Sequence, residues 1–308
     1  MKFGSRMGRR KFVMSRVAVV EPYRLDLTVN VLRRLSTNVV DRFEGGRYVR
    51  ALDGSSGPAI VAVEQREENA LHVEIDAPAG EDERALALVC RMLAPDRDVR
   101  GFARAAARIP WLGPFAKRMR GVNPPRYPTL WEACVNAVVF QQVSLSAAGA
   151  ILGRTVHALG QIVARDGGDL VAFPTPRAFL GASDAVLGAA GLSAAKMATL
   201  RRVGEALESG ALDEAMLEER DSAGASALLC AIKGIGPWTA TVVLLRGLGR
   251  LDVFPMNDSG VARSLRAFPG GVEADLAAAL PTLGPWKGML YYHLLLARLD
   301  AGGHLPAV

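Results

Sequence analysis

Residues 232–240 read I-K-G-I-G-P-W-T-A, a glycine-rich turn between two apolar runs with helical spacing. Glycine lets a phosphate approach closely, and the exposed N–H groups of such a turn can hold an anion. Gly234 accepts the left-handed conformation that ends a helix, and Pro237 favours a helix start. We therefore expect a first helix over 225–233 that ends at Gly234, a turn completed by Gly236, and a second helix.

A carboxylate, Asp258, follows this turn. Asp258 lies in the segment V-F-P-M-N-D-S and precedes a helical pattern with Val261 and Leu265 on one face. The simplest interpretation of Asp258 is a helix N-cap. Capping is compatible with catalysis, because a helix N-terminus favours a nearby negative charge. A fixed anion stabilises the cationic, oxocarbenium-like state of glycosidic cleavage.

Together the turn and the carboxylate resemble the helix–hairpin–helix–Gly-Pro-Asp superfamily of DNA glycosylases, and more closely its alkylpurine branch, DNA-3-methyladenine glycosylase II. The resemblance covers roughly residues 110–299. It implies that Asp258 is catalytic, stabilising the charge at C1′ and orienting the attacking water. It also implies that the hairpin binds the DNA backbone through Lys233, Gly234, Ile235 and Gly236. An ordinary tight corner between two helices is the alternative interpretation of the turn.

Two tryptophans are expected in the base pocket. Bifunctional relatives carry a Schiff-base lysine at the position of Trp238, so the resemblance implies a monofunctional hydrolase without lyase activity. An electron-rich ring attracts a positively charged N-alkylpurine by stacking and cation–π forces. Trp286, in L-G-P-W-K-G, matches a second pocket tryptophan of the branch, and core packing is the alternative for both rings. Val242 stands where some relatives carry a pocket tyrosine, which predicts a less aromatic cavity.

The segment Gln141-Gln142-Val143-Ser144 resembles the Q-x-x-S segment that enters the duplex in this family. A target base must leave the stack before it is cleaved, and a side chain must fill the gap. Gln141 is expected in the base pocket. Gln142 is expected as the DNA wedge, at a position where relatives often carry leucine. A polar kink between two helices is the alternative.

The expected fold class is α+β, a mostly α-helical helix–hairpin–helix core with a small N-terminal antiparallel β domain. Alternating strands are predicted over 47–52, 59–63 and 71–75, separated by glycine-rich turns, with a helix over 27–35. From Glu83 onward the pattern is helical. The predicted division is a β domain over residues 1–80, a helical subdomain of 81–125 plus 250–308 carrying Asp258, and a helical subdomain of 126–249 carrying the hairpin.

Composition and charge indicate the binding partners and cofactors of the chain. The 308 residues carry a formal net charge of +6, which favours a polyanion, and double-stranded DNA with damaged bases is the expected partner. The three cysteines lie far apart, without the closely spaced set of an iron–sulfur loop. No metal or organic cofactor is implied, although the family allows a monovalent cation at the hairpin carbonyls. No targeting or membrane segment is evident, so we expect a cytoplasmic monomer. The basic N-terminal arm is expected to be a disordered tail or a misassigned start, and a DNA-contacting arm is the alternative.

Two other functions stay open at this point. A non-catalytic DNA-structure binder would use the hairpin alone, but it would have no need of an anion aimed at DNA. A glycosylase for deaminated bases would need hydrogen-bond donors in the pocket, and the sequence shows no clear set of them.

Overall fold

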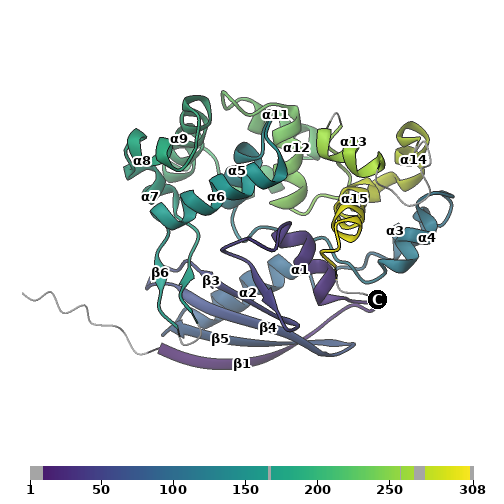
Figure 1. Ribbon diagram of the computed structural model, residues 1–308, viewed down its shortest axis with the longest axis horizontal. Coiled ribbons are helices and arrows are strands. Elements are labelled where there is room, and N and C mark those ends of the chain that lie inside the picture. Colours follow the sequence, from purple (N-terminus) through teal and green to yellow (C-terminus); the bar gives the residue numbers. More distant parts are fainter. Residues whose placement is uncertain (1–9, 166–167, 257, 267–274, 306–308) are drawn as a thin grey trace, which may run out of the picture.

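An antiparallel sheet forms the N-terminal part of the chain. The computed structural model describes residues 10–165, 168–256, 258–266 and 275–305. The strand order across the sheet is β1-β5-β4-β3-β2, and every neighbouring pair is antiparallel. Figure 1 shows the sheet below and the helices stacked above it. The strands are β1 (Arg10–Ala18), β2 (Arg42–Glu44), β3 (Arg47–Leu52), β4 (Ala59–Glu67) and β5 (Ala70–Pro78).

One face of the sheet is covered by two helices. Alternate residues of β5, among them Leu71, Val73 and Ile75, are buried, as a half-buried strand requires. The covering helices are α1 (Leu25–Arg33) and α2 (Asp82–Leu93). Both are strongly amphipathic, so their apolar stripes close the core against the sheet.

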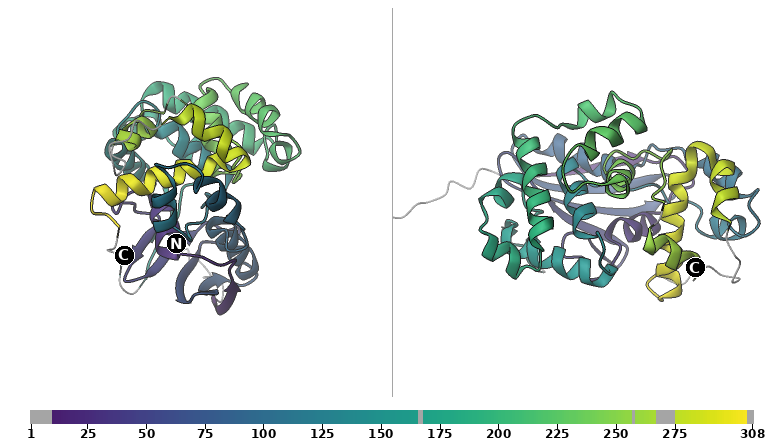
Figure 2. Two further views of the ribbon diagram at one scale, coloured as in Figure 1. Left: turned by 90° about the vertical axis from the view of Figure 1, so that its right-hand side faces the viewer. Right: turned by 90° about the horizontal axis from the view of Figure 1, so that it is seen from above.

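The helical part follows without a further large sheet (Figures 1 and 2). Its elements are α3 (Arg100–Ala106), α4 (Gly113–Arg118), α5 (Leu130–Val139), α6 (Leu145–Leu159), β6 (Ile162–Val163), β7 (Leu170–Val171), α7 (Pro176–Gly181), α8 (Asp184–Ala189), α9 (Ala194–Glu208), α10 (Glu214–Glu218), α11 (Ser222–Cys230), α12 (Pro237–Arg246), α13 (Ser259–Arg266), α14 (Leu276–Leu283), the 3-10 helix η1 (Gly284–Trp286) and α15 (Lys287–Ala301). The predicted α+β class is confirmed. None of the described helices is long and apolar enough to cross a bilayer.

Three local predictions need correction. The basic N-terminal arm is a strand from Arg10 onward, because β1 begins there and pairs with β5 along its whole length; residues 1–9 lie outside the described residues. A short hairpin of β6 and β7 interrupts the stretch expected to be helical after Glu83. The first hairpin helix, α11, ends at Cys230 rather than at Gly234, because residues 231–236 all belong to the turn.

Helix α5 is the centre of the molecule. Every residue from Leu130 to Val139 is buried, and the helix is apolar apart from Glu132 and Asn136, whose side chains have polar partners. It belongs to a core shared by the sheet, α9, α11 and α12, whereas α3, α4, α14 and α15 build a second core. Helix α2 packs in the first core, on the sheet. The division at 81–125 and 126–249 remains a proposal.

Candidate active site

The glycine turn joins α11 to α12 as the sequence predicts. Gly234 has φ +103°, and a Cβ there would lie 1.9 Å from Thr199 Oγ1, so only glycine fits. Gly236 is the N-cap of α12, and a Cβ there would meet nothing within 4 Å. The turn therefore packs against α9 at Gly234 and opens to solvent at Gly236.

The donors of the turn are not equivalent. Within the described part of the chain, the N–H groups of Gly234 and Gly236 have no hydrogen-bond acceptor. The N–H of Ile235 already donates to the Ile232 carbonyl (3.0 Å), and its side chain is buried. Lys233 is exposed beside them. The turn thus offers two free N–H groups and one ammonium, and Ile235 shapes the turn instead of offering a donor.

Two of the hairpin carbonyls, where the family allows a monovalent cation, already accept a hydrogen bond. The Lys233 carbonyl oxygen accepts from Arg202 Nη1 (3.2 Å), and the Gly234 carbonyl oxygen accepts from Gln141 Nε2 (3.2 Å). Each of these oxygens keeps a second lone pair, so the monovalent cation stays a prediction. Among the described residues, no group of three or more His, Cys, Asp or Glu side chains could hold a metal ion.

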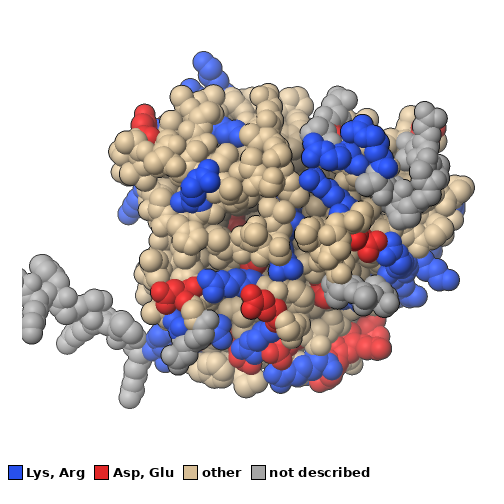
Figure 3. Space-filling view, in the orientation of Figure 1, with Lys and Arg blue, Asp and Glu red and all other residues tan. Residues whose placement is uncertain are grey.

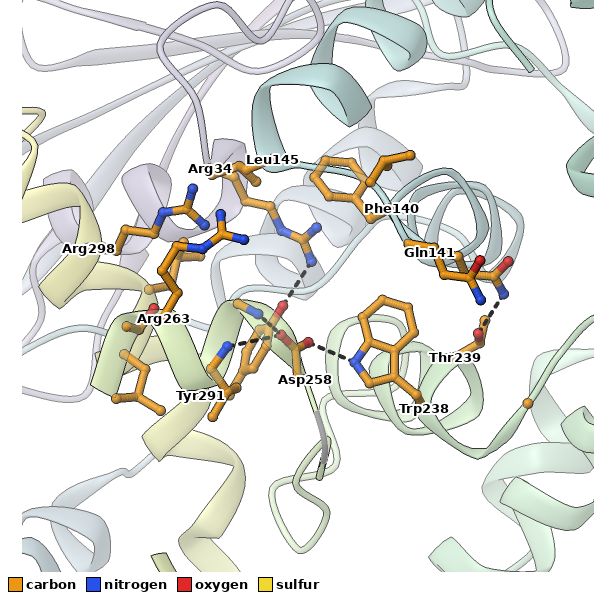
Figure 4. Close-up of a pocket in the computed structure, with 18 of the residues that line it drawn as sticks. Arg34, Phe140, Gln141, Leu145, Trp238, Thr239, Asp258, Arg263, Tyr291 and Arg298 are labelled. Atoms are coloured by element: carbon orange, nitrogen blue, oxygen red, sulfur yellow. Dashed lines mark hydrogen bonds between the residues drawn. The ribbon is translucent and has the colours of Figure 1, made fainter. Parts of the chain in front are cut away.

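Asp258 is held by three hydrogen bonds (Figure 4). Its Oδ1 accepts from the N–H groups of Gly260 (2.6 Å) and Val261 (2.9 Å), which makes Asp258 the N-cap of α13. Its Oδ2 accepts from the indole N–H of Trp238 (2.7 Å). The capping bonds and the indole bond fix the carboxylate from two sides, so its orientation is set before any ligand arrives.

A cavity of about 670 Å³ opens in front of this carboxylate. Three aromatic rings and three arginines line it together with Asp258. Figure 4 shows these side chains converging from α1, α5, α12, α13 and α15. The principal lining residues are Arg34, Phe140, Gln141, Gln142, Val143, Leu145, Trp238, Thr239, Asp258, Val261, Arg263, Tyr291, Leu294, Leu295 and Arg298.

Only one of the two predicted pocket tryptophans reaches this cavity. Trp238 lines it next to Asp258. Trp286 does not line it, and its ring packs against Gly101 of α3, where a Cβ would lie 2.5 Å from the indole. The core-packing alternative therefore holds for Trp286. Its place in η1, one turn before α15, turns the ring toward the second core, and Tyr291 and Leu295 of α15 face the cavity instead.

Two aromatic residues that the sequence analysis did not predict line the cavity. Phe140, at the end of α5, and Tyr291 line the cavity, whereas Val242 is buried and does not. Val242 therefore does not shape this cavity directly, and a cavity less aromatic than that of relatives with a tyrosine stays a prediction. Phe140 stands directly before the predicted wedge, but no local pattern separates it from the core residues of α5.

The predicted wedge segment forms the loop between α5 and α6. Gln141 donates to Thr239 Oγ1 (2.7 Å) and to the Gly234 carbonyl oxygen, so it ties this loop to the hairpin. Gln142 is exposed and has φ +55°, a left-handed conformation that non-glycine residues rarely adopt. Val143 beside it is also exposed, and Ser144 caps α6. The loop thus presents Gln142 and Val143 outward at the rim of the cavity.

An arginine from the N-terminal domain completes the cavity. Arg34 follows the last residue of α1 and is only 6% exposed. Its Nη2 donates to the Tyr291 hydroxyl (3.2 Å), and its guanidinium carbon lies 4.6 Å from the centroid of the Phe140 ring. Burial opposes its charge, but Tyr127, Tyr291 and Asp258 hold the pKa of Arg34 above its usual value. No sequence signal marks this residue.

Comparison with known proteins agrees with this geometry. The model of the HhH-GPD superfamily base excision DNA repair proteins matches residues 135–275. A DNA-3-methyladenine glycosidase from Bacillus halodurans is 32% identical over 67% of this chain and 90% of its own, with a TM-score of 0.50. The chain belongs to the HhH-GPD superfamily.

Two further proteins are similar to this HhH-GPD protein, one in fold and one over part of its sequence. A 3-methyladenine DNA-glycosylase from Archaeoglobus fulgidus shares its fold with a TM-score of 0.77 at 24% identity, over 93% of this chain and 99% of that one. That match includes the sheet as well as the helices. A probable bifunctional transcriptional activator/DNA repair enzyme AlkA from Mycobacterium tuberculosis is 30% identical over 66% of this chain. The match spans only 40% of that relative's length.

Proposed function

We propose that this HhH-GPD protein is a monofunctional DNA glycosylase that hydrolyses the N-glycosidic bond of flipped-out alkylated purines in double-stranded DNA. It would thereby initiate base-excision repair. The observation that carries the proposal is Asp258, a carboxylate fixed by three hydrogen bonds at the wall of a cavity large enough for a base. A protein that only binds DNA has no use for such an anion, because it repels phosphate.

The hydrogen bonds of Asp258 indicate different roles for its two carboxylate oxygens. A carboxylate oxygen has about two acceptor sites. Both sites of Oδ1 are taken by the Gly260 and Val261 amides, but among the described residues Oδ2 has only the Trp238 indole as a partner. Oδ2 therefore keeps one site for the attacking water and presents its charge to C1′. The base leaves with the electron pair of the glycosidic bond, and water adds to C1′.

The loop and the hairpin would hold the DNA around this reaction. Gln142 and Val143 project at the cavity rim, where a wedge would fill the gap left by the flipped base. The free N–H groups of Gly234 and Gly236, with Lys233, would bind a backbone phosphate. Gln141 donates hydrogen bonds to Gly234 and Thr239 of the hairpin, so it would hold the wedge loop at a fixed distance from the phosphate-binding turn. Trp238 would stack on the base.

The proposal excludes strand cleavage by a Schiff base. That chemistry needs a lysine amine within reach of C1′. Trp238 occupies the hairpin position where a lysine would stand, and none of the described residues that line the cavity is a lysine. Water is then the nucleophile, and the product is an abasic site in an intact strand.

Base release from methylated duplex DNA tests the proposal. We compare wild type with Asp258→Asn at protein concentrations that give equal DNA occupancy. Wild type is expected to free 3-methyladenine and 7-methylguanine, and the variant to bind without cleaving. Borohydride is expected to trap no protein–DNA adduct. If wild type binds duplex DNA but frees no base from any methylated substrate, the DNA-structure binder is the better assignment.

A further inference from the structure

A second cavity, of about 750 Å³, lies between α3, α4 and the first half of α15. Met289 and His293 of α15 line this cavity. Tyr291 and Leu295 of the same helix line the cavity beside Asp258. Residues four apart share one face of a helix, so the two pairs lie on opposite sides of α15. The second cavity is therefore separated by a helix from the proposed active site.

The floor of the second cavity is apolar. The buried side chains that form it are Phe102, Ile109, Met119, Val122 and Met289. Its volume falls within the range of about 300–1,000 Å³ that is typical of small-molecule sites. Covering such a floor with an apolar body removes apolar surface from water, which is favourable. The floor therefore favours a ligand with an aromatic or aliphatic body.

His293 adds one polar group to this floor. Its side chain is only 2% exposed, and its ring lies 4.5 Å from the Phe102 ring, centroid to centroid. The ring Nδ1 contacts the Met289 carbonyl oxygen (2.9 Å), so Nδ1 carries the proton and donates. Burial lowers the pKa of His293 to about 4, which keeps the ring neutral near pH 7 and makes Nε2 an acceptor.

The Nε2 acceptor of His293 lacks a protein donor. It is the ring atom farthest from the backbone of α15, and no described residue donates to it. A buried acceptor without a donor is costly, so such a group calls for an explanation. A ligand in the cavity that His293 lines would supply the missing N–H or O–H.

The rim of the second cavity is basic. Residues 99–120, which include α3 and α4, contain six Lys or Arg residues and no Asp or Glu. Figure 3 shows basic side chains gathered at the right-hand side of the molecule, over these two helices. Arg104, Lys117 and Arg120 line the cavity, are exposed and form no ion pair with a described residue. None of the described residues that line the cavity is acidic, so the rim is complementary to an anion.

A DNA backbone is a poor occupant for this cavity. Phosphates of a duplex bind cations and amides at a surface, and the backbone has no apolar body to cover the floor. It also offers no N–H or O–H donor to His293 Nε2. The combination of an apolar floor, a buried acceptor and a basic rim instead fits a small amphipathic molecule.

We propose that the cavity between α3, α4 and α15 is a second ligand site, which takes a small organic anion with an apolar body and one N–H or O–H donor. The body would cover the floor, and the donor would bond to His293 Nε2. The anionic group would lie among Arg104, Lys117 and Arg120. The site goes beyond the proposed glycosylase function, and it stays accessible while DNA occupies the other side of α15.

Fluorescence titration with anilinonaphthalene sulfonate tests the site. This dye combines fused aromatic rings, an N–H donor and a sulfonate, and it brightens in apolar surroundings. The double variant Arg104→Glu, Lys117→Glu reverses two exposed charges of the rim, so its Tm is expected to match wild type. Its affinity for the dye in this site is expected to fall on the order of tenfold, because attraction becomes repulsion.

Two control variants assign the dye to this cavity. Arg108→Glu reverses an exposed charge of the same segment that does not line the cavity, and Arg263→Glu reverses one that lines the cavity beside Asp258. Neither is expected to change the component of dye binding that the double variant loses. If the double variant binds the dye as wild type does, or if Arg108→Glu weakens it equally, the second site is wrong.

Competition by a matched pair of acids tests His293. Indole acetate carries an N–H, and its N-methyl analogue does not. Indole acetate is expected to displace the dye about fivefold better than the analogue, the size of one hydrogen bond. His293→Phe keeps a ring against Phe102 and removes the acceptor, so the difference is expected to disappear. Equal competition by the two acids in wild type would contradict the role of His293.

Addition of duplex DNA separates this site from the proposed function. The dye component that the double variant loses is expected to persist in saturating duplex, and both proteins are expected to release base from methylated DNA at the same rate. Displacement of this component by duplex would make the rim part of the DNA-binding surface and overturn the inference. Absence of base release in both proteins would overturn the proposed function and leave the second site intact.

Discussion

At the scale of single residues, Asp258 shows that a structural and a chemical role can share one side chain. Its Oδ1 caps α13 through two amides, and its Oδ2 faces the indole of Trp238. The N-cap interpretation is therefore correct and does not compete with the catalytic one. The cap holds the carboxylate at the cavity wall, and the indole sets the direction in which its second oxygen points.

Replacing Trp238 by phenylalanine tests the indole bond, because the ring is kept and the donor is lost. The rate of base release at equal DNA occupancy is expected to fall about tenfold, the size of one hydrogen bond to a charged group. Trp286→Phe is the control. It removes an indole that packs on α3 outside the cavity, so stability is expected to fall while the rate stays constant. Equal rates for wild type and Trp238→Phe would contradict the positioning role.

His293 predicts a pH dependence of stability. It is buried in α15 between Phe102 and Phe115, and burial lowers its pKa from 6.5 to about 4, opposed by its bond to the Met289 carbonyl. Below pH 6.5 the unfolded chain takes up a proton that the folded chain does not. Proton uptake by the unfolded chain therefore lowers the free energy of unfolding as the pH falls from 6.5 to 4, by roughly 3 kcal/mol in total. Above pH 6.5 His293 is neutral in both states and has no such effect.

Urea unfolding over this pH range measures the effect in wild type and in His293→Leu. The leucine variant cannot titrate, so its free energy of unfolding is expected to depend less steeply on pH. Identical slopes for the two proteins would show that other groups cause the dependence.

At the scale of elements, the hairpin depends on two glycines for different reasons. Gly234→Ala would place a methyl group on Thr199 at φ +103°, and a loss of at least about 2 kcal/mol of stability is expected.

At Gly236 the backbone angles are ordinary and there is open space for a methyl group. Gly236→Ala is expected to fold with nearly unchanged Tm and to bind duplex DNA several-fold more weakly, because its methyl group stands where a phosphate would approach. Thermal unfolding and DNA titration of the pair measure both effects. Unchanged DNA affinity in Gly236→Ala would contradict the phosphate site.

At the scale of the whole molecule, a buried ion cluster joins the sheet to the central helix. Arg50 of β3 pairs with Asp41 (2.8 Å) and with Glu132 of α5 (2.5 Å), and all three side chains are buried. Burial raises the pKa of the Glu132 carboxyl even beside this guanidinium. Removing Arg50 would leave two buried carboxylates without their partner.

Arg50→Leu is therefore expected to lower the free energy of unfolding by about 3–5 kcal/mol. Arg16→Leu on β1 is the control, because Arg16 pairs with Glu67 at an exposed site (2.6 Å) and a change of at most about 1 kcal/mol is expected. Urea denaturation measures both variants. A loss in Arg50→Leu no larger than in Arg16→Leu would show that the cluster does not join sheet and helix energetically.

The sequence by itself determined the features that depend on local chemistry. The hairpin, the cap at Asp258, strands β3 to β5, and the break between α5 and α6 all follow from turn residues, capping residues and hydrophobic period. These signals act over a few residues, so they are readable without knowing how the elements pack. The first strand, β1, was not predicted, because its apolar residues Phe12, Val13 and Met14 are consecutive and do not alternate with polar ones, and because its pairing partner, β5, lies far along the chain.

Only the tertiary structure decided what surrounds the carboxylate. Trp286 carried the motif of a pocket residue but packs on α3, whereas Arg34, Phe140 and Tyr291 meet in the cavity from three distant segments. The physical reason is that a side chain's neighbours depend on how helices pack against one another. A rotation of α15 by a fraction of a turn exchanges which residues face the cavity, and no local sequence pattern encodes that rotation.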